Sequence, residues 1–235
     1  MKILVLSEGA LDHGDTLDSK HATGRAARRS IDGQPDRKGA VTILVRRLLE
    51  EKLRRTIAES EIVTRALPRV NRRSTAQSGY EYKVRDAIVE ARISKCSAVV
   101  IVVDRDGTSP GLRLTALAAG RALADQQGEA LAGKTALGVA VETVEAWLLA
   151  DETALNAALD PHPPAATTPS PELLDGAARS PKHPKTQLRS LLDRARREVS
   201  WPYDEIAEKV RLDVLAARCP AGFAPFATEV KARGG

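Results

Sequence analysis

Apolar runs and helically spaced apolar residues alternate along the first 160 residues of the chain. Four short runs of mostly apolar residues predict β-strands, because strands that are buried on both faces lack regular polar positions. Between these runs, apolar residues recur every three or four positions, the spacing of a helix with one face toward a core. The expected strands are residues 2–7, 60–67, 98–103 and 135–141, and the expected helices are residues 40–57, 80–94, 112–127 and 142–159.

Strands that alternate with helices of this length form parallel sheets through right-handed crossovers. The sequence therefore predicts an α/β fold with a mostly parallel four-stranded sheet flanked by helices. Residues 160–171 contain five prolines and mark a boundary. We expect a first domain over residues 1–160 and a small α-helical C-terminal lobe over residues 161–235, with helices at 185–198 and 203–217.

Two segments fall outside this alternation. Residues 9–38 are polar and form a longer connection than a strand and a helix usually need, which is typical of a functional loop. The tail at residues 219–226 contains Phe223 and Phe226, which we expect to pack on the helices of the C-terminal lobe.

The composition narrows the class of protein. Lys and Arg number 36 against 31 Asp and Glu, and the sequence pI is about 9.4, which suits a polyanionic partner. Only 3% of the residues are aromatic, so a nucleic acid would be held through its phosphates rather than by base stacking. Because no apolar stretch approaches ~20 residues and no signal peptide is evident, we expect a cytoplasmic protein without a membrane partner.

Carboxylates follow two of the expected strands. Glu8 comes directly after the first strand, and Asp104 and Asp106 come directly after the third. Ligands of open α/β sheets gather at the carboxyl ends of the strands. Carboxylates that meet there repel one another unless a cation neutralises them, and their oxygens suit Mg²⁺. The sequence therefore predicts a Mg²⁺ site, with Mn²⁺ as an alternative ion.

Further charged residues are candidates for the same site. Glu142 follows the fourth expected strand and can point toward the same edge of the sheet. Glu145 falls in the first turn of the next helix, where the helix dipole also favours a carboxylate. One of these two glutamates would complete a second metal position. Lys182 and Lys185 form either a phosphate-facing edge or the ordinary basic start of a helix.

A strand that ends in Glu-Gly, followed by a later strand that ends in Asp-x-Asp, resembles the Toprim domain. This domain occurs in topoisomerases, primases and overcoming-lysogenization-defect nucleases, where a glutamate and an Asp-x-Asp pair bind magnesium beside a phosphodiester. The resemblance implies that Glu8 is a metal ligand or the general acid/base. It also implies that Asp104 and Asp106 are metal ligands.

Three more segments are similar to a Toprim-related bacterial family whose genes sometimes lie beside those of ATPases. These segments are residues 139–151, 180–185 and 219–223. The resemblance implies a magnesium-dependent nuclease that acts on nucleic acid, with DNA favoured over RNA. It further implies an ATPase partner and a role in phage defence, and it is compatible with a homo-oligomer.

Other interpretations of these patterns remain open. The residues from Asp104 to Thr108 also look like the nucleophile motif of haloacid-dehalogenase-type phosphatases, in which Asp104 attacks phosphorus and Asp106 is the acid/base. Such an enzyme needs a further strand with an acidic pair, and it leaves Glu8 without a role. A third interpretation is a non-catalytic regulatory partner of an ATPase. Residues 128–135 match the letters of a phosphate-binding loop, but they follow a helix and precede a strand, the reverse of that loop.

Overall fold

The computed structural model describes residues 1–8, 39–67, 79–105, 110–166, 168, 170–174, 180–195 and 202–234. The expected functional loop at residues 9–38 lies outside these ranges, and so does Asp106.

Four parallel strands form one sheet in the order β2-β1-β3-β4. The α/β fold with a four-stranded parallel sheet is therefore confirmed. Every residue of β1, β3 and β4 is buried, as their apolar sequences predict, whereas the edge strand β2 is partly exposed. The bounds are Ile3–Ser7 for β1, Ile62–Ala66 for β2, Ala98–Asp104 for β3 and Thr135–Ala140 for β4.

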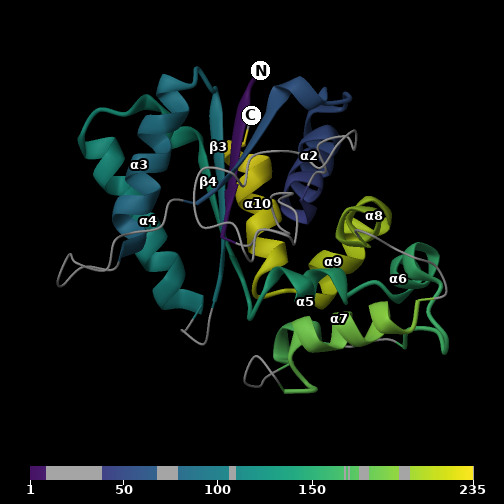
Figure 1. Cartoon of the computed structure of the whole chain (residues 1–235). Coiled ribbons are helices and arrows are strands. Elements are labelled where there is room, and N and C mark those ends of the chain that lie inside the picture. The colour runs from purple at the N-terminus through teal and green to yellow at the C-terminus, as the bar shows by residue number, and fades with distance from the viewer. Residues whose placement is uncertain are drawn as a thin grey trace, which may run out of the picture.

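Two layers of helices cover the two faces of the sheet (Figure 1). Successive residues of a strand point to opposite faces. Ile3 and Val5 therefore pack on one side, with helices α2 and α10, and Leu4 and Leu6 pack on the other side, with helices α3 and α4. The bounds are Ala40–Leu53 for α2, Gly79–Ile93 for α3, Pro110–Gln126 for α4 and Phe223–Arg233 for α10.

The helix that was expected over residues 142–159 is two helices, α5 (Val144–Leu148) and α6 (Glu152–Leu159). Asp151 causes the break, because its side chain accepts the backbone N–H groups of Thr153 (3.1 Å) and Ala154 (3.3 Å) and so begins a new helix.

The helix that was expected over residues 203–217 is likewise two helices, α8 (Pro202–Lys209) and α9 (Leu212–Arg218). Arg211 lies between them in an extended conformation, and its N–H donates to the Asp151 carboxylate at 3.0 Å. One aspartate therefore determines both breaks. The remaining helix of this part, α7, spans Pro184–Asp193.

Helix α10 was not expected from the sequence. It lies beside α2 on the sheet, and its aromatic residues contact Trp147 of α5. The Phe226 ring stacks on Trp147 (centroids 5.4 Å apart, 16° between planes), and Phe223 meets Trp147 edge-on at 5.4 Å. A Cβ atom on Gly138 of β4 would lie 2.5 Å from the Phe226 ring, so this strand position requires glycine. One hydrophobic cluster thus contains residues from both sides of the boundary expected near residue 160.

Residues 128–135, which match the letters of a phosphate-binding loop, lie between a helix and a strand, as expected. Helix α4 ends at Gln126, a short 3₁₀ helix covers Ala130–Lys134, and β4 begins at Thr135. A phosphate-binding loop needs a strand before it and a helix after it, so residues 128–135 do not form one. Among the helices that the structure describes, none is long and apolar enough to cross a membrane.

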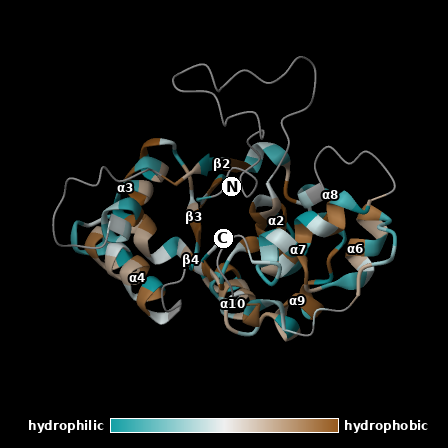
Figure 2. Cartoon of the chain, turned by 60° about the horizontal axis from the view of Figure 1, so that its bottom comes forward, coloured by the Kyte–Doolittle hydropathy of each residue, from teal (hydrophilic) through white to brown (hydrophobic). Residues whose placement is uncertain are grey.

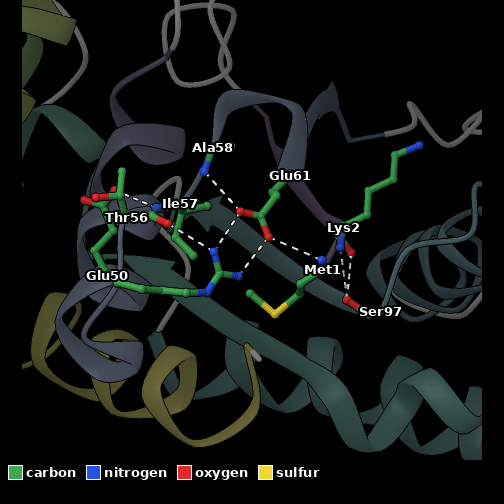
Figure 3. A network of polar contacts seen from close by, with 9 residues as sticks. Met1, Lys2, Glu50, Thr56, Ile57, Ala58, Glu61 and Ser97 are labelled. Atoms are coloured by element: carbon green, nitrogen blue, oxygen red, sulfur yellow. Dashed lines mark hydrogen bonds and ion pairs between the residues drawn. The ribbon is translucent and has the colours of Figure 1, made fainter.

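Ion pairs and hydrogen bonds connect residues at the amino edge of the sheet, the edge opposite the carboxyl ends of the strands (Figure 3). The Glu61 carboxylate accepts two hydrogen bonds from the Arg55 guanidinium, both at 2.8 Å, and one from the Ala58 N–H at 3.1 Å. The Arg55 hydrogen bonds are the main cause that lowers the pKa of Glu61 to about 2. These contacts connect the end of α2 to the start of β2.

Candidate functional site

Carboxylates follow three neighbouring strands at the carboxyl edge of the sheet. Glu8 comes directly after β1, Asp104 is the last residue of β3, and Glu142 lies two residues after the end of β4. Because β1 pairs with β3 and β3 pairs with β4, all three strands end at the same edge. This edge lies at the bottom of the sheet in Figure 1, and Figure 2 turns it toward the viewer.

Glu8 leaves the sheet on the side of α3. Its Oε1 accepts a hydrogen bond from the Tyr80 hydroxyl at 2.6 Å and lies 3.4 Å from the Lys83 Nζ. Its Oε2 is buried and has no hydrogen-bond partner among the residues that the structure describes. The side chains of Lys83 and Arg113 lie over the Tyr80 ring, at 4.4 and 4.2 Å from its centroid. Cations over an aromatic face are attracted to it, so this cluster combines a carboxylate, a phenol and two positive charges.

Asp104 leaves the sheet on the opposite side, toward α5 and α7. It is 7% exposed. Its Oδ1 accepts the N–H of Val144 at 3.2 Å, and its Oδ2 lies 3.5 Å from the Lys185 Nζ. The structure therefore brings together two predicted site residues that are 81 positions apart.

The start of α7 positions Lys185. His183 is the N-cap residue, and its Nδ1 accepts the backbone N–H of Lys185 at 3.2 Å. Pro184 occupies the first helical position, where its fixed φ suits a helix start. Lys182 lies before the helix and is exposed. The expected basic helix start is therefore present, and one of its two lysines faces the strand-end aspartate.

Glu142 occupies an unusual backbone conformation. Its φ is 60°, in the left-handed region that residues other than glycine rarely adopt. The Thr143 N–H donates to the Val141 carbonyl at 3.0 Å across it, and this three-residue turn leads the chain from β4 into α5. The Glu142 side chain is buried and forms an ion pair with Arg105. Strained backbone of this kind is enriched at functional sites.

Glu145 lies in the first turn of α5, as expected, and is 5% exposed. It is buried, together with the rest of this short helix.

The predicted carboxylates do not form one group in the described part of the chain. Strand alternation explains why: Glu8 continues the face of Leu4 and Leu6, whereas Asp104 continues the opposite face of Val100 and Val102. Among the described residues, no set of three or more His, Cys, Asp or Glu is arranged to hold a metal ion. Asp106, the third expected ligand, lies outside these residues.

Each strand-end carboxylate instead has a basic partner. Lys83 pairs with Glu8, Lys185 pairs with Asp104 and Arg105 pairs with Glu142. Two features fit a bound cation at this edge: the buried Glu8 Oε2 without a described partner, and the Lys185 ammonium beside Asp104, where a positive charge is already accommodated.

Sequence reasoning missed Tyr80, Lys83 and Arg113. Tyr80 and Lys83 are three positions apart and therefore lie on one face of α3, but only the fold shows that this face meets Glu8.

No protein-family model, curated protein or solved structure matches the chain. The resemblance to Toprim-related families therefore stays a prediction.

Proposed function

We propose that the chain is a metal-dependent nuclease that hydrolyses phosphodiester bonds of nucleic acid, with Mg²⁺ or Mn²⁺ at the carboxyl edge of the sheet. One observation carries the proposal: three neighbouring strands each deliver a carboxylate to that edge, beside basic side chains from α3 and α7. Carboxylates at such an edge are suited to a hard cation, and the nearby basic side chains are suited to phosphate.

Asp104 and Glu8 would have two different roles, because they lie on opposite sides of the sheet. Asp104 would hold the metal, and Asp106, Glu142 and Glu145 are the further candidate ligands. When bound, the metal polarises the scissile phosphate and stabilises the charge on the departing oxygen. Glu8 lies on the side of α3, and its contact with the Tyr80 hydroxyl suits a group that moves a proton to or from water, or that binds a second ion.

The basic residues would hold the nucleic acid through its phosphates. Lys185 lies at the start of α7 beside Asp104, and Lys182 lies just before that helix. Lys83 and Arg113 lie over the Tyr80 ring, whose hydroxyl contacts Glu8. Contacts to phosphates position a nucleic acid without reading its sequence. We propose DNA as the preferred substrate. We also propose an ATPase partner, a role in phage defence and cytoplasmic location, in line with the Toprim-related resemblance.

The phosphatase alternative has less support. It needs a further strand with an acidic pair after the Asp104 strand and β4. In the described residues beyond β4, the chain forms helices and one isolated bridge between Pro161 and Ala195. It also gives no role to the contact of Glu8 with Tyr80.

Cleavage assays with matched variants test the proposal. The full chain is incubated with plasmid DNA or RNA, with and without Mg²⁺ or Mn²⁺. We expect metal-dependent cleavage that falls about a hundredfold in Asp104→Asn, because this variant loses one charged ligand. Asp125→Asn removes an exposed aspartate on α4 and should cleave normally.

Other outcomes would support the alternatives. Phosphate release from a small phosphomonoester, unaffected by Glu8→Gln, would favour the phosphatase. Absence of cleavage with either metal, alone or with an ATPase partner, would overturn the nuclease and favour the regulatory module.

A further inference from the structure

We propose that Lys185 and a divalent metal ion bind Asp104 in exchange for one another. The Lys185 ammonium pairs with the Asp104 carboxylate and would leave it when the metal binds. This inference rests on the proposed function, since it concerns the same carboxylate, and it adds a regulatory step to that site.

The two oxygens of Asp104 have different surroundings. Oδ1 accepts the N–H of Val144, a backbone group fixed at the start of α5, whereas Oδ2 faces the ammonium of Lys185 at 3.5 Å. Because the carboxyl group is buried, it needs a compensating positive charge. A metal ion bound through Oδ2 would supply that charge and would repel the ammonium at this short separation.

Lys185 can leave without disturbing the fold. Its side chain is 48% exposed, so the ammonium can move into water. Its backbone is held separately by the His183 cap at the start of α7. The exchange therefore moves one flexible side chain and leaves the helix in place.

The displaced ammonium then becomes available to phosphate. Lys185 would change from an internal counter-ion into a contact for the nucleic acid when the metal arrives. Metal binding and polyanion binding would thus strengthen one another, and such coupling is reciprocal.

Isothermal titration calorimetry with MnCl₂ tests the exchange on the full chain, without substrate. Removing the competing charge in Lys185→Met should tighten Mn²⁺ binding about three- to fivefold, the range for a partly exposed ion pair. Lys185→Arg keeps a competing charge and should bind Mn²⁺ no more tightly than the wild type. Lys134→Met removes the same charge from an exposed lysine just before β4, at the opposite edge of the sheet, and should change the Kd less than about 1.5-fold. Circular dichroism checks that all variants are folded.

The possible outcomes separate this inference from the proposed function. If the wild type binds Mn²⁺ and Lys185→Met binds it no more tightly than Lys134→Met does, the exchange is wrong, while the metal-dependent nuclease stands. If none of the proteins binds Mn²⁺, both the exchange and the metal site of the proposed nuclease are overturned.

Discussion

Replacing Asp151 by asparagine should lower the free energy of unfolding by about 2 kcal/mol at neutral pH. Asp151 is 1% exposed and connects two parts of the chain. It caps α6 through Thr153 and Ala154, and it accepts three hydrogen bonds from Arg211: from the backbone N–H at 3.0 Å, from Nε at 2.9 Å and from Nη2 at 3.0 Å. Asparagine is an equally good helix cap, so the substitution removes mainly the negative charge.

The magnitude follows from the pKa of this carboxyl group. Burial raises the pKa of Asp151, but the hydrogen bonds from Arg211 and Ala154 outweigh burial and lower it to about 2. An aspartate in an unfolded chain has a pKa of about 3.9, and a difference of this size corresponds to about 2.6 kcal/mol at pH 7. More than half of the Arg211 side chain is exposed, so water screens the pair and reduces the expected loss to about 2 kcal/mol.

The sign of the pH dependence is fixed by the lowered pKa. The contribution of Asp151 is fully present above about pH 5, where the carboxylate is ionised in both the folded and the unfolded chain. It is lost as the pH falls toward 2, because protonation then favours the unfolded state. The wild type and Asp151→Asn should therefore differ at pH 7 and converge as the pH falls from about 5 toward 2.

Urea unfolding followed by far-UV circular dichroism measures the difference at a series of pH values. Asp125→Asn, which changes an exposed aspartate on α4, is the control and should match the wild type throughout. A loss below about 0.5 kcal/mol at pH 7, or a loss that stays constant down to pH 3, would refute the reasoning.

Two further predictions concern the core and the candidate site. Gly138→Ala should lower the free energy of unfolding by about 1–3 kcal/mol in thermal unfolding, because the new methyl group would meet the Phe226 ring. Gly133→Ala is the control and should have little effect, because there is open space around its Cβ. Equal losses in the two variants would contradict this explanation. Tyr80→Phe should slow metal-dependent cleavage about tenfold, because it removes the hydroxyl that donates a hydrogen bond to Glu8. The midpoint of thermal unfolding should change little. An unchanged cleavage rate would exclude a role for this contact.

The sheet and its acidic edge could be predicted from the sequence because both are local features. The apolar run before Asp104 is buried along its whole length, so the strand and the carboxylate at its end follow directly from the order of residues. The breaks at Asp151 and Arg211 could not be predicted, because the contact between these residues joins segments 60 positions apart.

Long-range contacts also explain the features that the sequence did not indicate. Helix α10 is stabilised by the stacking of Phe226 on Trp147 and by Glu172, whose carboxylate accepts the N–H of Ala221 just before the helix. At the candidate site, the alternation of strand residues could have shown that Glu8 and Asp104 face opposite sides. Their partners Lys83 and Lys185 depend on how α3 and α7 pack, and neither arrangement is encoded in a short motif.

The position of α10 on β4 affects how the protein is made in the cell. The ribosome must add the 82 residues between Ala140 and Phe223 before the helix that covers this strand exists. At ordinary rates of translation this takes roughly 4 to 16 s. During that interval the side of β4 that α10 later covers lacks the rings of Phe223 and Phe226. Slow codons in this stretch would lengthen the exposure of this apolar surface and so favour aggregation.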